Sequence, residues 1–62
     1  MTTPRIIKLK EVMNLTSLSR ASIYRYLKEN TFPSQIKIGV RSVGWKESEI
    51  LDWIELRPTV KN

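Results

Sequence analysis

The stretch LSRASIYRYLKEN, residues 18–30, decides how this chain folds. Ser19 is a preferred helix N-cap, because its side-chain oxygen can accept a hydrogen bond from a backbone N–H of the first turn. Asn30 can adopt the left-handed conformation that ends many helices. Together these residues predict a helix from Arg20 to about Glu29.

The predicted helix has an apolar side and a basic side. Ile23 and Leu27 lie four residues apart and are expected to face the core, with Tyr26 beside them. The positions left for the outer side are Arg20, Ser22, Tyr24, Arg25 and Lys28. For a single basic helix, a solvated surface that binds nothing is the alternative to a polyanion-binding face. The neighbouring segments decide between the two.

A second short helix is predicted before this one. Leu9, Val12 and Met13 follow the i, i+3, i+4 spacing of a short amphipathic helix. Thr16 and Ser17 then prefer turns and caps to helix interiors. Two short helices joined by three or four residues form a helix-turn-helix arrangement.

After the second helix the chain changes from helical spacing to alternation. Ile36 and Ile38 alternate with polar residues, which predicts a strand with one buried face. Gly39–Ser42 predicts a turn and Val43–Trp45 a returning strand. This segment is therefore expected to be a small β-hairpin, with Arg41 near its tip.

The segment KESEILDWIEL, residues 46–56, predicts a third helix. Ile50, Trp53 and Ile54 form its apolar stripe, and its carboxylates lie largely elsewhere. The acidic residues at its start favour the helix dipole. Pro58 ends whatever precedes it.

The expected fold is therefore mainly α with a small β-hairpin: a single winged helix-turn-helix domain over residues 1–62, with an ordered core from about 6 to 57. A domain of about 60 residues buries only about 60% of the surface that its unfolded chain exposes, so the core is small. The residues expected to hold it together include Ile23, Leu27, Trp45 and Trp53.

Composition excludes several classes of function. The chain has no Cys and no His, which excludes zinc fingers, thiol catalysis and a Ser-His-Asp triad. We expect no catalytic residue, no metal and no cofactor, and the chain is not expected to be an enzyme. It has no apolar run of ~18 residues and no signal-peptide core, so a soluble cytoplasmic protein without a membrane partner is expected.

The net charge of +5 is unevenly distributed. Residues 1–46 carry nine Lys or Arg against two Glu, a net charge of +7. Residues 47–62 carry two basic residues against four acidic ones, a net charge of −2. This asymmetry favours a polyanion on the face built by the first part of the chain, with the acidic part turned away.

Double-stranded DNA is the polyanion that a helix-turn-helix and a wing predict. A recognition helix reads base edges in the major groove, while hydroxyls and Lys suit phosphates. Tyr24 is open between groove contact and surface packing, and Arg41 on the wing is expected to meet phosphates or the minor groove. The predicted DNA-binding residues are Arg20, Ser22, Tyr24, Arg25, Lys28, Lys37 and Arg41.

Residues 9–54 carry a family resemblance. The chain shows L-K-E-V from Leu9, F-P at 32–33, G-x-R-x-x-G-W from Gly39 and E-S-E at 47–49. In this combination the chain resembles the AlpA family of short prophage regulators, whose fold is similar to that of MerR-type DNA-binding domains and small phage excisionases. The resemblance implies a DNA-binding transcriptional regulator of a prophage or integrated element.

The resemblance also implies a helix-turn-helix over Glu11–Glu29 and a wing over Gly39–Ser42. Ser17 stands where the family usually has a turn glycine, and Asn30 where glycine is common at the helix end. If residue 17 needs a positive φ, serine costs about 1 kcal/mol relative to glycine. Residues 21 and 22 read Ala-Ser where the family usually reads Ser-Thr, which changes contacts at the helix start.

Two alternatives share these features. An excisionase would bend attachment-site DNA and assist an integrase, which would then be a partner. A protein-binding adapter would use the same fold to inhibit another regulator. Because the chain ends just after the third helix, we expect a monomer or weak homodimer that assembles cooperatively on DNA.

Overall fold

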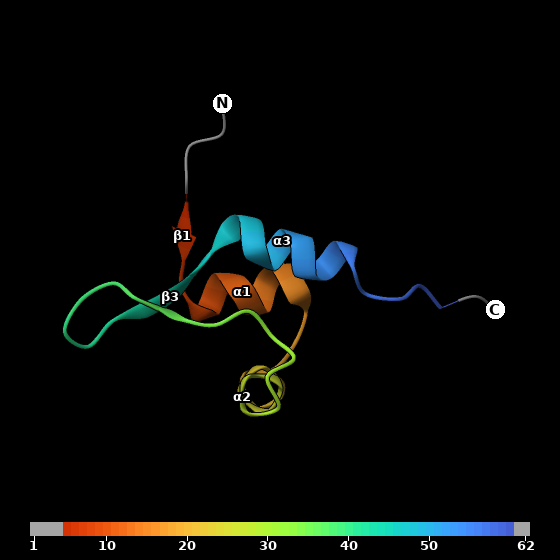
Figure 1. Ribbon diagram of the computed structural model, residues 1–62, viewed down its shortest axis with the longest axis horizontal. Coiled ribbons are helices and arrows are strands. Elements are labelled where there is room, and N and C mark those ends of the chain that lie inside the picture. Colours follow the sequence, from red (N-terminus) through yellow and green to blue (C-terminus); the bar gives the residue numbers. More distant parts are fainter. Residues whose placement is uncertain (1–4, 61–62) are drawn as a thin grey trace.

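Three helices and three short strands make up residues 5–60, the part of the chain that the computed structural model describes. In chain order they are β1 (Ile6–Ile7), α1 (Leu9–Thr16), α2 (Arg20–Lys28), β2 (Ile36–Lys37), β3 (Val43–Lys46) and α3 (Glu47–Glu55). In Figure 1, α1 lies between α3 and α2, and the strands extend to one side of the helices. The predicted mainly helical fold is confirmed, while the terminal residues of the predicted domain lie outside the described part.

The sheet has three strands rather than the two that the sequence predicted. All neighbours are antiparallel in the order β1-β3-β2, with Ile7 opposite Trp45 and Ile36 opposite Gly44. The backbone N–H of Glu47 also donates to the carbonyl oxygen of Arg5 over 2.8 Å. The prediction missed β1 because two residues are too few to show an alternating pattern.

The turn between α1 and α2 spans residues 17–19 and is set by local hydrogen bonds. Ser17 has φ 60° and ψ 20°, so the residue at the usual glycine position does adopt the left-handed conformation. The Thr16 hydroxyl donates to the Val12 carbonyl over 2.7 Å, and the Leu18 N–H donates back to that hydroxyl oxygen. These bonds hold the turn although serine is strained there.

Both predicted ends of α2 are confirmed. At its start the Ser22 N–H donates to the Ser19 hydroxyl oxygen over 3.2 Å, which is an N-cap hydrogen bond. At its end Asn30 has φ 60°. The N–H groups of Asn30 and Thr31 donate to the carbonyls of Leu27 and Tyr26, a Schellman motif that satisfies the last turn.

The core lies where the three helices meet β1 and β3. Its buried residues are Ile7, Val12, Ile23, Phe32, Trp45 and Ile50. The prediction for Ile23 and Trp45 is confirmed, whereas Leu27 and Trp53 are partly buried and pack against this cluster. Both indole N–H groups are satisfied: Trp45 donates to the Pro33 carbonyl at 2.9 Å and Trp53 to the Thr31 carbonyl at 2.8 Å.

Phe32 joins the two tryptophans, which the sequence did not predict. Its ring lies edge-on to both, with centroids 6.3 Å from Trp45 and 4.8 Å from Trp53. Trp53 in turn lies 6.1 Å from the ring of Tyr26 on α2. This aromatic cluster therefore fixes α3 against the C-terminal part of α2.

The predicted strand with one buried face is met only in part: β2 forms, but Ile36 is half-buried and Ile38 lies beyond the end of β2. Ile38 is 44% exposed, and a Cβ placed on Gly44 would lie 2.7 Å from its Cδ1 atom. Because neighbouring residues of a strand face opposite sides, Gly44 faces away from the buried side of Trp45. The isoleucines therefore cover Gly44 on the outer face of the sheet, and β2 contributes little to the core.

Candidate nucleic-acid interface

The exposed side of α2 presents an arginine, a tyrosine and a lysine in one row. Arg20, Tyr24 and Lys28 follow each other at intervals of four residues, and all three are exposed. Arg25 is exposed beside this row, four residues after the exposed Ala21. We call the side chains of these four larger residues the outer face of α2.

Ser22 lies at the edge of the outer face and is half-buried. The Ser22 N–H donates a hydrogen bond to the Ser19 hydroxyl oxygen. The Ser19 hydroxyl in turn donates to the Ser22 hydroxyl oxygen over 3.1 Å. The Ser22 hydroxyl proton is left to donate elsewhere. Capping of α2 is thus its observed role, and DNA contact stays a prediction.

No acidic side chain neutralises the cations of the outer face within residues 5–60. The ion pairs in this range join Arg5 to Glu11 at 3.0 Å and to Glu47 at 2.8 Å. Arg25 instead stacks on an aromatic ring, with its guanidinium carbon 5.3 Å from the centroid of Tyr26. The outer face therefore keeps its positive charge free for an anionic ligand.

A hairpin loop, residues 38–42, connects β2 to β3 and extends away from the helices (Figure 1). The N–H groups of Ile38 and Gly39 donate to the carbonyl of Ser42 at 2.8 and 3.2 Å, which closes the loop. Arg41 is exposed in it, and Val40 at its tip is 91% exposed. The structure thus places the predicted wing arginine on a projecting loop.

Lys37 lies on the same side of the sheet as the helices. It pairs with Val43, which lies two residues from the buried Trp45 and therefore shares its face. The Lys37 side chain is nevertheless exposed, because β2 is at the edge of the sheet. It can therefore contribute charge to the side of the molecule that carries α2.

The acidic residues gather on the opposite helix. Glu49, Asp52 and Glu55 are exposed on α3, which lies on the far side of α1 from α2 in Figure 1. The charge asymmetry of the sequence thus becomes an asymmetry in space. An approaching polyanion is attracted to the side of α2 and repelled by α3.

Two basic residues with defined contacts were not singled out from the sequence. Arg5 joins α1 to the start of α3 through its two ion pairs, and no local pattern predicts such a long-range contact. Arg57 stacks on Trp53, with its guanidinium carbon 4.6 Å from the ring centroid. The four-residue spacing between Trp53 and Arg57 is a signal that could have revealed this stack.

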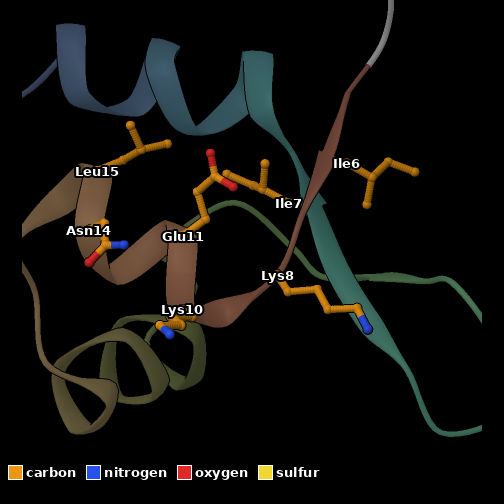
Figure 2. Close-up of a pocket in the computed structure, with 7 residues that line it drawn as sticks. All are labelled: Ile6, Ile7, Lys8, Lys10, Glu11, Asn14 and Leu15. Carbon is orange, nitrogen blue, oxygen red and sulfur yellow. The ribbon is translucent and has the colours of Figure 1, made fainter.

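A shallow cavity of about 530 Å³ lies between β1 and α1 (Figure 2). It is lined by Ile6, Ile7, Lys8, Lys10, Glu11, Asn14 and Leu15. Figure 2 shows the side chains of Lys8, Lys10 and Glu11 pointing in different directions. Since its charged groups do not converge, this cavity offers no arrangement for catalysis or for binding a small ligand.

The range of residues 5–60 contains no group of three or more His, Cys, Asp or Glu side chains that could hold a metal ion. None of its helices is both long enough and apolar enough to cross a bilayer.

Comparison with known proteins agrees with the sequence resemblance. The family model described as Prophage CP4-57 regulatory protein (AlpA) matches residues 5–58. The DNA-binding transcriptional activator AlpA of Escherichia coli K12 is 41% identical over 59 residues, which covers 86% of this chain and 84% of that protein.

A protein of Enterobacteria phage P4, the uncharacterized protein ORF88, is 38% identical over 53 residues. The match covers 86% of this chain but only 60% of the phage protein. No solved structure matches significantly. With a family model that matches nearly its whole length and a relative at 41% identity, the chain belongs to the AlpA family of prophage regulatory proteins.

Proposed function

We propose that this protein is a sequence-specific DNA-binding transcriptional regulator of the AlpA type, encoded by a prophage or an integrated element. The observation that carries the proposal is the outer face of α2. It is a capped helix after a three-residue turn, and its exposed cations have no acidic partner within residues 5–60. A relative that is 41% identical is a DNA-binding transcriptional activator.

In this proposal the fold is a winged helix-turn-helix. Helix α1 and the turn at Ser17 support α2, which enters the major groove as the recognition helix. Arg25 bonds base edges, and Arg20 and Lys28 contact phosphates at either end of the helix. Tyr24 lies between them on the exposed side and meets a base or a sugar.

The hairpin loop is the wing. It carries Arg41 beyond the end of the sheet, where it can reach the backbone of an adjacent groove, while Lys37 supplies a phosphate contact at its base. Helix α3 turns its carboxylates away from the DNA. No cofactor is needed, because all contacts come from side chains and backbone.

The test is to incubate the purified protein with sheared genomic DNA of the organism that encodes it and to sequence the retained fragments. A shared motif should emerge, and a duplex carrying it should bind more tightly than a scrambled duplex, with an affinity that falls steeply as salt rises. The proposal fails if no motif is enriched and binding to both duplexes is weak and insensitive to salt. Tight binding to a protein instead would support an adapter.

If the retained DNA fragments come from the attachment region of an integrated element, an excisionase becomes the better explanation. Excision reconstituted in vitro with integrase should then require this protein. For a transcriptional regulator, transcript levels should change in cells without integrase when the protein is supplied. The Lys46→Ala variant is the control in both assays, because Lys46 is exposed at the end of β3 and outside the proposed interface.

A further inference from the structure

Arg57, just after the end of α3, touches the aromatic cluster from outside. Its guanidinium carbon lies 4.6 Å from the ring centroid of Trp53 and 5.9 Å from that of Tyr26. Tyr26 belongs to α2, so a side chain that follows the acidic helix reaches back to the proposed recognition helix. Arg57 belongs to residues 47–62, the acidic part of the chain that was expected to face away from DNA.

The same tyrosine ring carries a second guanidinium. Arg25 lies 5.3 Å from the centroid of Tyr26, so the two guanidinium carbons are at most about 11 Å apart. Two arginines from separate elements thus meet at one ring. Their two positive charges raise the electrostatic potential on this side of the molecule, which favours an anionic ligand there.

The stacking of Arg57 also prepares it to bind an anion. A guanidinium stacked on an aromatic ring keeps the N–H groups in its own plane available for a phosphate, and the ring limits its motion. Arg57 makes no ion pair within residues 5–60, although α3 offers several carboxylates nearby. Its charge is therefore not used to neutralise its own helix.

The position of Arg57 would widen the interface on the side away from the hairpin loop. In Figure 1 the hairpin loop and the C-terminal segment lie at opposite ends of the long axis, with α2 between them. Since α2 is seen end-on in this view, a duplex that crosses α2 parallel to the long axis would pass the hairpin loop on one side and the segment that follows α3 on the other.

We propose that Arg57 binds a phosphate of the DNA backbone and extends the interface beyond the C-terminal end of α2. This inference rests on the proposed DNA-binding function. It predicts that Arg57 anchors the protein without reading sequence, because phosphates are the same on every duplex.

The experiment compares Arg57→Ala with the parent and with Lys46→Ala, a variant of equal net charge. Binding to the specific and scrambled duplexes is measured from 50 to 200 mM salt, below the melting temperature of each variant. Arg57→Ala should weaken both complexes alike and reduce the slope of log K against log salt by about 0.9. Its deficit should then shrink about 3.5-fold between 50 and 200 mM salt. Lys46→Ala should keep the parental slope.

Arg57→Lys separates charge from packing. It keeps the positive charge and should restore the salt slope, although it loses the planar stack. The inference is overturned if Arg57→Ala has the parental slope, or if Arg57→Lys has the same reduced slope as Arg57→Ala. If Arg25→Ala and Arg41→Ala lose affinity while Arg57→Ala does not, only this inference fails. If the parent itself shows no salt-dependent binding, the proposed function fails with it.

Discussion

Arg25 and Arg41 differ in the kind of DNA contact that their positions allow. Arg25 lies on the outer face of α2, where a groove-inserted helix meets base edges, and Arg41 lies on the hairpin loop. Loss of a bidentate base contact in Arg25→Ala should cost about 1–3 kcal/mol on the preferred site and little on random DNA. Arg41→Ala should weaken both complexes alike and lower the salt slope by about one.

Binding of both variants to specific and scrambled duplexes across a salt series checks this prediction. Their melting temperatures act as a control for folding. Arg41→Ala should melt like the parent, while Arg25→Ala loses its stack on Tyr26 and should melt no more than about 8 °C lower. Equal losses for Arg25→Ala on both duplexes would show that it does not read sequence.

Ser17 is a second single residue with a measurable consequence. Its φ of 60° is a conformation that glycine adopts without strain. Ser17→Gly should therefore stabilise the fold by about 1 kcal/mol, which raises the melting temperature by about 4–8 °C.

Ser34→Gly is the matched control for Ser17→Gly. Ser34 is also exposed and lies outside the helices and strands, but its φ is not positive. Glycine there should leave stability unchanged or lower it slightly, because it only adds freedom to the unfolded chain. A gain for Ser34→Gly as large as that for Ser17→Gly would show that strain at residue 17 is not the cause.

At the scale of elements, β3 depends on the absence of a side chain at Gly44. A Cβ atom there would lie 2.7 Å from the backbone oxygen of Ile7 and 2.7 Å from Cδ1 of Ile38. The Ile7 oxygen belongs to the neighbouring strand and cannot move without disturbing the sheet. Gly44→Ala should therefore destabilise the protein by about 1–3 kcal/mol, measured by urea unfolding.

Gly39→Ala is the control for this prediction. The nearest atom to its added Cβ is the Cβ of Ser42 at 3.9 Å, an ordinary van der Waals contact, and Gly39 has no positive φ. Alanine should be tolerated there. Equal urea midpoints for the two variants would mean that β1 and β2 do not pack across Gly44 as described.

The helices could be predicted from sequence because their signals are local. Ser19 and Asn30 mark the ends of α2 within a dozen residues, and both were confirmed by the hydrogen bonds at those ends. The small sheet could not be predicted in full. Strand β1 pairs with residues about 40 positions away, and the face on which Ile38 lies is set by the pairing of β2 with β3.

The candidate interface was predicted as far as it lies on α2 and the hairpin loop. The exposure of Arg20, Tyr24, Arg25 and Lys28 follows from helical spacing around the buried Ile23. The position of Arg57 against α2 could not be predicted from helical spacing, because it depends on how α3 packs against α2 through the aromatic cluster. Tertiary packing thus brings next to α2 a residue that its local sequence assigned to the acidic part.

At the scale of the whole molecule, a chain of 62 residues has little stability to lose. A domain of this size is stabilised by about 5 kcal/mol, at the low end for native proteins. Within residues 5–60 six hydrophobic residues are buried, and the aromatic contacts of Trp53 with Tyr26 and Phe32 join α3 to α2 beside them. Removal of one large ring from this cluster should therefore affect every element together.

Trp53→Ala tests this dependence. Trp53 packs edge-on against Phe32, lies beside Tyr26, donates a hydrogen bond to the Thr31 carbonyl and supports the guanidinium of Arg57. Its loss should cost roughly 3–5 kcal/mol, which approaches the whole stability of the domain. Circular dichroism at 25 °C should then show a largely unfolded chain, and DNA binding should be lost as a consequence.

Leu56→Ala, which truncates a side chain that is 84% exposed, should melt like the parent. A Trp53→Ala variant that melts like the parent but no longer binds DNA would instead identify Trp53 as a contact residue, and the aromatic cluster would then belong to the interface rather than to the core.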